Sequence, residues 1–258
     1  MTRIAIVTGA SSGLGWEFVK HIDAGQAGPV DEIWAVARRA ERLDALVRTC
    51  ATRVRPFCLD LTDPDSFDLL EAALTETPEA NVALLVNNAG FGTFGDFALL
   101  EPGDASNMMR VLALAPVELM YRALPHMHEG SRIINIASVA AFLPQPRLAV
   151  YAAAKRFLLD VTRSLDAELA EVGIHATAVC PKFMKTGFLD APGDADAAAR
   201  MEAIGFERTD RVVAAALRAA KSGRSLCIPA PDMKTYYALT RITPYPLALK
   251  IEKLLGIL

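Results

Sequence analysis

The chain has 258 residues, of which 52% are apolar and 22% charged, and its formal net charge is −3. This length and composition predict one soluble, cytoplasmic α/β domain, and the slight acidity argues against a nucleic-acid-binding surface. No apolar run reaches the length of a membrane span or a signal peptide, and the cysteines and histidines lack metal-binding spacing, so we expect free thiols and no metal site.

Short apolar runs alternate with helical patterns along the chain. The runs predict strands at Ile4–Thr8, Glu32–Ala37, Val54–Leu59, Ala83–Asn87, Arg132–Ala137, Ile174–Cys180 and Ser225–Ile228. The patterns between them predict helices at Gly13–Asp23, Arg39–Thr49, Pro64–Glu76, Asp104–Leu124, Val150–Val172 and Thr209–Ser222. Apolar strands separated by helices are typical of a parallel sheet covered on both faces. We therefore predict a single-domain, Rossmann-like doubly wound fold of about seven strands over residues 1–258.

A glycine-rich turn joins the first predicted strand to the first predicted helix. Its spacing is G-x-x-x-G-x-G, and its residues include Gly9, Ser11, Ser12, Gly13, Leu14 and Gly15. Glycines let the backbone approach a ligand, and the helix N-terminus offers free N–H groups and a positive dipole end. A strand, such a turn and a helix in this order predict a phosphate cradle, with a plain turn as the alternative.

Tyr151 and Lys155 stand four residues apart in a predicted helix, so they share one helix face. An ammonium beside a phenol favours the phenolate, which predicts a lowered phenol pKa. Such a phenol can exchange a proton while a hydride moves to or from carbon. Ser138 follows a predicted strand and would stand at the carboxyl edge of the sheet, where ligands bind. A surface Tyr–Lys pair is the alternative interpretation.

Together these features resemble the classical branch of the short-chain dehydrogenase/reductase family. The resemblance covers residues 3–190 and rests on Thr8 to Gly15, Asp60-Leu61, Asn87 to Gly90, Ser138, Tyr151, Lys155, and Pro181 with Thr186. It implies an oxidoreductase that transfers a hydride between a nicotinamide cofactor and a carbonyl or alcohol substrate. It also implies a homodimer or homotetramer through the helices near 104–124 and 150–172.

The resemblance also implies roles for single residues. Tyr151 would be the general acid and base, Lys155 would lower its pKa and hold the nicotinamide ribose, and Ser138 would hydrogen-bond the substrate oxygen. Further cofactor contacts would come from Asp60 and Leu61 beside the adenine, from Asn87, Ala89 and Gly90 at a strand end, from Pro181, and from Thr186 at the carboxamide.

The end of the second predicted strand favours NADP over NAD. Ala37 stands where a family member that prefers NAD usually carries an acid for the ribose hydroxyls. Arg38 follows at once, and its fork would match the 2′-phosphate geometrically and stays charged, with Arg39 next to it as a further cofactor contact. Ser11 could add a hydroxyl donor. Solvated arginines at a helix start are the alternative.

Two positions depart from the family pattern. Leu112 stands where many members have an asparagine that supports a water chain to the lysine, and leucine cannot bind a water. Lys182 follows Pro181 where the family has a glycine, which permits close backbone approach to the cofactor. Lys182 either orders water or meets a phosphate there, or it points to solvent. These departures leave an alternative function open, a cofactor-binding sensor or partner-binding protein with little catalysis.

Two segments lie outside the regular alternation of strands and helices. Residues 183–207 are expected to form a lid over the cleft, and residues 229–258 a C-terminal extension. Leucines and isoleucines at helical spacing from Leu247 to Leu258 predict a helix packed on the body or on a second subunit. A wall for a long apolar substrate, or a contact with a membrane surface, is the alternative. Segments expected near the cleft favour an apolar substrate through Phe91, Phe94, Phe142, Phe183, Met184 and Phe188.

Overall fold

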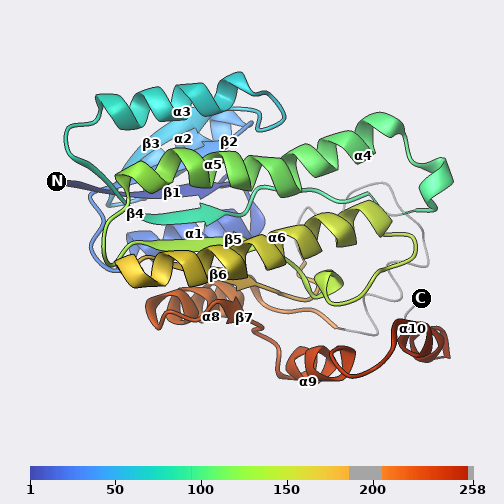
Figure 1. Cartoon of the computed structure of the whole chain (residues 1–258). Helices are drawn as coiled ribbons and strands as arrows, with labels where there is room; N and C mark the ends of the chain where they lie inside the picture. The colour runs from blue at the N-terminus through green and yellow to red at the C-terminus, as the bar shows by residue number, and fades with distance from the viewer. Residues whose placement is uncertain (94, 186–204, 255–258) are drawn as a thin grey trace.

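A parallel sheet of seven strands forms the centre of the computed structural model, which describes residues 1–93, 95–185 and 205–254, and side chains to residue 250 (Figure 1). The strand order is β3-β2-β1-β4-β5-β6-β7, and each neighbouring pair is parallel. The strands are β1 Thr2–Thr8, β2 Glu32–Ala37, β3 Arg53–Cys58, β4 Ala80–Asn87, β5 Arg132–Ile136, β6 His175–Val179 and β7 Leu226–Cys227. The predicted doubly wound fold is confirmed.

Helices cover both faces of the sheet because its central strands are apolar on both sides. On one face Ala5 and Val7 of β1 pack with helices α1, α2 and α8, and on the other Ile4 and Ile6 pack with α3 and α5 and with the C-terminal half of α6. Each of these four β1 side chains is at most 2% exposed. The helices are α1 Gly13–Asp23, α2 Ala40–Thr49, α3 Asp65–Glu76, α5 Ala115–Ala123, α6 Ala149–Leu169 and α8 Thr209–Lys221.

The helix predicted at Asp104–Leu124 is interrupted by a wider turn. It consists of α4 Pro102–Met109, a π-helical turn η2 Arg110–Leu114, then α5 and a 3-10 turn η3 Leu124–His126. The backbone N–H of Ala115 bonds the carbonyl of Arg110, five residues back, which is the π pattern. Single π turns inside α-helices often lie at functional sites, and this one carries Leu112.

The C-terminal extension contains two helices, α9 Pro231–Thr240 and α10 Tyr245–Leu254, which lie beyond the sheet edge that carries β7 (Figure 1). Short 3-10 turns complete the described elements at η1 Phe97–Leu99, η4 Val139–Ala141 and η5 Ala170–Val172. The predicted apolar stripe is described only at its start, where Leu247 is 51% exposed. Most of the predicted lid lies outside the described residues.

Among the described residues, none of the helices has the length and apolarity needed to cross a membrane. In the same part of the chain no three His, Cys, Asp or Glu side chains are grouped as a metal ion would require. All four cysteines are free thiols.

Candidate active site

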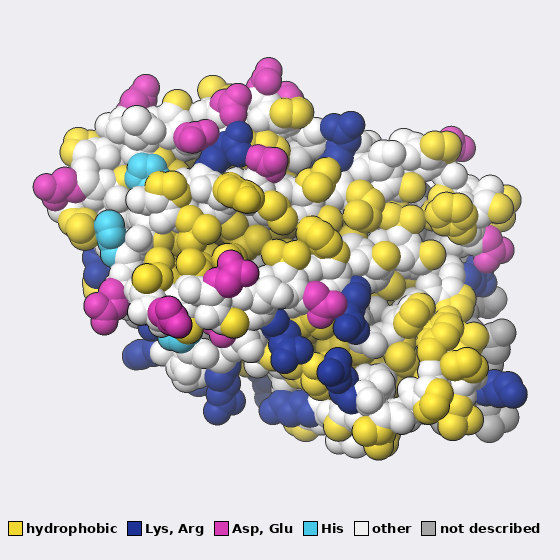
Figure 2. Space-filling view, viewed as in Figure 1, with side chains coloured by type: hydrophobic (Ala, Val, Ile, Leu, Met, Phe, Trp, Pro, Cys, Tyr) yellow, Lys and Arg dark blue, Asp and Glu magenta, His cyan; other side chains and the backbone are white. Residues whose placement is uncertain are grey.

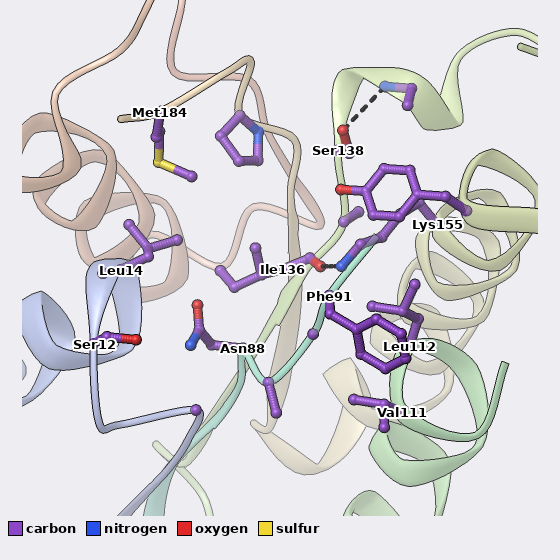
Figure 3. A pocket seen from close by; sticks show the side chains of 18 of the residues that line it. Ser12, Leu14, Asn88, Phe91, Val111, Leu112, Ile136, Ser138, Lys155 and Met184 are labelled. Atoms are coloured by element: carbon purple, nitrogen blue, oxygen red, sulfur yellow. Dashed lines mark hydrogen bonds between the residues drawn. The ribbon is translucent and has the colours of Figure 1, made fainter. Parts of the chain in front are cut away.

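The carboxyl ends of the strands open into one large cavity of about 520 Å³. Ligands bind at this edge of a doubly wound sheet, where the strand order reverses around β1 and β4. Figure 3 shows Ser12 and Leu14 on one side of the cavity and Ser138 and Lys155 on the other. The predicted site residues that line it are Gly9, Ser11, Ser12, Gly13, Leu14, Arg38, Arg39, Asp60, Leu61, Ala89, Gly90, Ser138, Tyr151, Lys155 and Pro181.

The glycine-rich turn is too tight for side chains at two of its positions. Gly9 has a φ of +67°, and a Cβ there would lie 2.8 Å from Asn88 Nδ2. A Cβ on Gly15 would lie only 2.3 Å from the carbonyl oxygen of Gly9. Helix α1 starts with Ser12 as its N-cap, and no side-chain hydrogen bond caps it. The N–H groups of its first turn are therefore open to an anion, so the turn fits the pyrophosphate of a dinucleotide.

Asn88 holds this turn in place from the neighbouring strand. The hydroxyl Oγ1 of Thr8 accepts hydrogen bonds from the backbone N–H groups of Asn88 (2.9 Å) and Ala89 (3.0 Å). The Asn88 amide donates in return to the Thr8 carbonyl at 2.9 Å. Asn87 has a different place, because it is buried in the sheet and its amide donates to Asn135 Oδ1 at 2.8 Å. Asn87 thus supports the sheet beside the cavity instead of lining it.

Two arginines lie beside the glycine-rich turn at the end of the cavity formed by β2 and β3. The guanidinium of Arg39 donates to Ser11 Oγ at 2.9 Å and to Ser12 Oγ at 2.7 Å. Arg38 has a side chain that is 72% exposed, and its Nη1 atom lies 3.9 Å from Asp60 Oδ2. Arg39 is therefore the more firmly held of the two cations.

Carboxylate charge at this end of the cavity comes from Asp60 at the end of β3 instead of from the end of β2, where Ala37 stands. Burial alone would raise the pKa of Asp60, but hydrogen bonds from Thr62 and the charge of Arg38 lower it below its ordinary value. Asp60 Oδ1 accepts from both the backbone N–H and the hydroxyl of Thr62, each at 2.9 Å. Asp60 is thus an ionised residue of the turn after β3 as well as part of the cavity wall.

Ser138, Tyr151 and Lys155 meet in the middle of the cavity. Ser138 is the N-cap of η4, where its Oγ accepts from the N–H of Ala140 at 3.1 Å, and it also hydrogen-bonds Tyr151. Lys155 Nζ lies 5.7 Å from the centroid of the Tyr151 ring. It donates to the carbonyl oxygen of Ile136 at 2.6 Å, as the dashed line in Figure 3 marks. A phenol, a hydroxyl and an ammonium are therefore brought together at one strand end.

Burial controls the protonation of both titratable groups. It raises the pKa of Tyr151 to about 12, against a smaller opposing effect of the hydrogen bond with Ser138. It lowers the pKa of Lys155 to about 8. The prediction that the lysine lowers the phenol pKa is wrong here, because desolvation dominates and the ammonium lies over the ring and binds a carbonyl. Tyr151 is therefore a protonated acid at neutral pH.

Leu112 fills the space next to the lysine, as Figure 3 shows. Its side chain is 1% exposed, and a Cβ built on Gly90 would lie 2.7 Å from Leu112 Cδ2 and 4.0 Å from Lys155 Nζ. An apolar side chain thus stands where the family pattern has an amide. The ammonium of Lys155 is held instead by the carbonyl of Ile136.

Lys182 is bound to the C-terminal extension. Its Nζ lies 2.9 Å from Asp232 Oδ2 at the start of α9, and its side chain is only 13% exposed. Its backbone N–H donates to Glu207 Oε2 at 2.8 Å. The alternative in which Lys182 points to solvent is therefore wrong, and α9 engages the ammonium.

Three of the predicted apolar residues, Phe91, Phe183 and Met184, line the cavity. Phe142 lies in a buried cluster beside it, with its ring 4.7 Å from the ring of Tyr237. Gly15 does not line the cavity but shapes the turn that does. Three predicted residues lie outside the described part of the chain, and these are Phe94, Thr186 and Phe188.

Several residues at the end of the cavity away from the glycine-rich turn were not predicted from the sequence. They are Val139, Ala140, Gln145, Leu148, Met233 and Tyr236. The last two come from α9, which no predicted helix covered. Pro231 and Asp232 in its first turn form a helix-start signal that could have revealed it, because proline suits the first helical position and an acid suits the positive dipole end.

Comparisons with known proteins agree with this geometry. A family model described as short chain dehydrogenase matches residues 3–196. The 2-(R)-hydroxypropyl-CoM dehydrogenase of Xanthobacter autotrophicus is 33% identical over 195 residues, which cover 72% of this chain and 76% of that protein. A short-chain dehydrogenase from Sphingobium yanoikuyae in complex with NADPH superposes with a TM-score of 0.78 at 25% identity, over 93% of this chain and 92% of that one. A short chain dehydrogenase/reductase from Burkholderia phymatum in complex with NAD has the same fold, with a TM-score of 0.79 at 23% identity over 92% of each chain.

Proposed function

This chain belongs to the short-chain dehydrogenase/reductase family, and from that premise we propose how its own residues carry out the reaction. It is an oxidoreductase that moves a hydride between a nicotinamide cofactor and an alcohol or carbonyl group. The observation that carries the proposed roles is that Ser138, Tyr151 and Lys155 meet in the cavity that the glycine-rich turn also lines. The alternative of a binding protein without turnover is not favoured.

The proton is proposed to come from Tyr151. When bound, the cofactor supplies the hydride in reduction and accepts it in oxidation. Ser138 would hydrogen-bond the carbonyl oxygen of the substrate and hold it beside the phenol. Tyr151 is protonated at neutral pH, since burial raises its pKa to about 12, and would donate its proton as negative charge develops on that oxygen. In the oxidation of an alcohol the same groups would act in reverse.

The residues proposed to hold the cofactor follow the length of the cavity. The glycine-rich turn and the N-terminus of α1 would bind the pyrophosphate. Asp60 and Leu61 would border the adenine, and Lys155 would bind the nicotinamide ribose. Thr186 remains a proposed carboxamide ligand from the sequence alone.

Turnover of carbonyl compounds tests the proposal directly. Purified protein would be mixed with NADPH and a panel of aldehydes and ketones graded by size, and NADPH oxidation would be followed by absorbance. We expect reduction of at least one apolar carbonyl compound, and its loss in Tyr151→Phe. Tight NADPH binding with no turnover of any compound would instead support the sensor alternative.

We propose that the cofactor is NADP(H). Solved structures with this fold carry either NADPH or NAD, so they do not decide the preference. The support comes from the cavity end beside Ala37, where the structure has two arginines and the carboxylate of Asp60 is already engaged by Thr62. Arg39 is held on the hydroxyls of Ser11 and Ser12, and such a held fork suits a 2′-phosphate.

Titration of both cofactors against single arginine variants tests the preference. Arg39→Ala and Arg38→Ala should each weaken NADP(H) binding by about 1–3 kcal/mol, because each removes a charge-assisted contact. NAD(H) binding should stay the same and serves as the internal control. Equal affinities for the two cofactors in the wild type would overturn the proposal.

A homodimer or homotetramer is proposed, with association through the face formed by α5 and α6. Figure 2 shows hydrophobic side chains gathered there, and Leu114, Tyr121 and Phe157 are 55%, 73% and 40% exposed. Apolar patches of this kind mark association surfaces. Light scattering after size exclusion should give a dimer or tetramer for the wild type and a smaller species for Tyr121→Arg. Leu69→Arg on α3, also an exposed apolar position at 58%, is the matched control and should leave the mass unchanged.

A further inference from the structure

We propose that the ion pair between Lys182 and Asp232 is a positioning device, which holds α9 as the wall of the cavity end that receives the body of the substrate. This pair would then set the KM for carbonyl substrates with a bulky apolar body and leave small carbonyl substrates unaffected. The inference rests on the proposed function, because it concerns the substrate of the same site.

The pair joins two segments that are far apart in the sequence. Lys182 follows β6 directly after Pro181, which lines the cavity, and Asp232 is the second residue of α9. Their charged atoms are 2.9 Å apart. The backbone of Lys182 is fixed separately, because its N–H donates to Glu207 Oε2 at 2.8 Å. Lys182 therefore tethers the first turn of α9 to the segment that follows β6.

Helix α9 contributes side chains to the cavity from positions next to this anchor. Met233 follows Asp232 directly, and Tyr236 lies one helical turn further on, so both lie close to the ion pair. The ring of Tyr236 also lies 6.2 Å from the ring of Phe142 in the neighbouring apolar cluster. A displacement of the first turn of α9 would therefore move both lining side chains.

The apolar side chains of α9 that pack on the cluster around Phe142 are only partly buried. None of the side chains in Pro231–Thr240 is fully buried, whereas α8 buries six of its side chains, from Val212 to Ala220. A helix without a buried stripe depends more on single polar contacts for its position. The lysine side chain of this pair is 13% exposed and the Asp232 side chain 52%, so solvent screens the pair in part.

The position of Asp232 adds to the strength of the contact. A carboxylate in the first turn of a helix is stabilised by the N-terminal dipole. The hydrogen bond from Lys182 lowers the pKa of Asp232, so the carboxylate stays charged through neutral pH. Lysine at this position therefore replaces a glycine of the family pattern with a contact that only a long cationic side chain can make.

The decisive experiment compares two carbonyl substrates in variants of the pair. A small aldehyde needs only Ser138 and Tyr151, whereas a bulky diaryl ketone also reaches α9. In Asp232→Asn we expect the KM for the ketone to rise about three- to fivefold, from the loss of one partly screened ion pair. The KM and kcat for the aldehyde, and the Kd for NADPH, should not change.

The matched control is Asp210→Asn. Asp210 also stands in the first turn of a helix and is paired with an arginine, Arg208, at 2.7 Å, but it does not line the cavity. The Asp210→Asn variant should have the wild-type KM for both the aldehyde and the ketone. Lys182→Met should reproduce the effect of Asp232→Asn, Lys182→Arg should retain much of the wild-type KM, and the double variant should be no worse than either single variant.

Hydrogen exchange of the α9 amides gives a readout that needs no substrate. Exchange in residues 232–240 should be faster in Asp232→Asn than in wild type or Asp210→Asn, with α8 unchanged. Failure of the wild type to reduce any carbonyl compound would contradict the proposed function but leave this test of the ion pair standing. Unchanged exchange, or an equal rise in KM for both substrates, would overturn the inference.

Discussion

The two ends of the cavity are built in different ways. The end beside the glycine-rich turn is built on the ends of β1, β2, β3 and β4, and it leaves no room for side chains at Gly9 and Gly15, where a Cβ would lie 2.8 Å and 2.3 Å from its nearest neighbour. The other end consists of side chains from η4, the loop before α6, the segment after β6, and α9. The first end therefore tolerates few substitutions, whereas the second end can tolerate many.

This contrast separates the part of the function that is fixed from the part that varies. The pyrophosphate is common to all nicotinamide dinucleotides, so backbone N–H groups at a strand end can hold it, and only the 2′-phosphate that distinguishes NADP from NAD would require side chains such as Arg38 and Arg39. The body of a substrate differs from enzyme to enzyme, and it would be met by side chains from loops and short turns, where sequences vary most. We therefore expect substitutions at the first end to slow the reactions of all substrates alike. Substitutions at the second end should change the KM of some substrates more than that of others.

The strongest effect is expected where the two ends meet. Tyr151→Phe should reduce turnover by about 10²–10⁴-fold while NADPH binding stays nearly unchanged, because the ring remains and only the proton donor is lost. Steady-state rates and an NADPH titration measure the two quantities. Tyr121→Phe, at a phenol that is 73% exposed, is the control and should have wild-type rates. A Tyr151→Phe enzyme with wild-type turnover would show that another group supplies the proton.

The next effect tests the rigidity of the cofactor end. Gly15→Ala should reduce stability by about 1–3 kcal/mol and weaken NADPH binding, because its Cβ would lie 2.3 Å from the backbone oxygen of Gly9. Urea unfolding and an NADPH titration measure these changes. Gly103→Ala in α4 is the matched control, since a Cβ there has nothing within 4 Å. Normal binding in Gly15→Ala would show that the turn can open at no cost.

A smaller effect concerns the buried ammonium at the centre of the site. Lys155 has a pKa of about 8 in the folded protein against an ordinary value of 10.5, so between these values the unfolded chain binds more protons. The free energy of unfolding should therefore rise with pH in this window, by up to about 1.4 kcal/mol per pH unit, relative to Lys155→Met. Urea unfolding at intervals from pH 7 to 10 measures the slope. Parallel curves for the two proteins would mean that burial does not lower this pKa.

The weakest effect concerns the missing asparagine. Leu112→Asn should raise the turnover rate and reduce its solvent deuterium isotope effect if the resupply of protons limits turnover. The amide would enter a site that is 1% exposed, so a stability loss of about 1–3 kcal/mol should accompany it. Leu112→Ala disturbs the packing more than Leu112→Asn but adds no amide, and is the control. Identical rates and isotope effects in all three proteins would make this position irrelevant to proton transfer.

Local patterns predicted the elements that form the glycine-rich end of the cavity. The bounds of β2 and α1 agree with the sequence-based ranges Glu32–Ala37 and Gly13–Asp23, because an apolar run and a strong helical period are properties of neighbouring residues. The place of Ser138 near the glycine-rich turn followed from the rule that strand ends share one edge, whereas the grouping of Tyr151 and Lys155 with them was implied by the family resemblance.

The parts that were missed depend on distant contacts. Helix α9 has no buried stripe, so it has no helical apolar period to detect. The partners Lys182 and Asp232 are fifty residues apart, and neither position alone indicates the other. The pKa of Tyr151 was predicted in the wrong direction because spacing along a helix shows which charges are near but not how deeply the phenol is buried.

The π-helical turn at Arg110–Leu114 also gives the chain a place where its length can vary. Such a turn is equivalent to one residue inserted into an α-helix, with the extra residue absorbed in the wider loop of backbone. Loss of one residue there should therefore leave the faces of α4 and α5 in place, whereas the same deletion within α5 would turn its buried face toward solvent. Relatives can accordingly differ by one residue in this stretch and keep the same fold. Which side chain approaches Lys155 is then decided by the presence of the π-helical turn and not by counting along the chain.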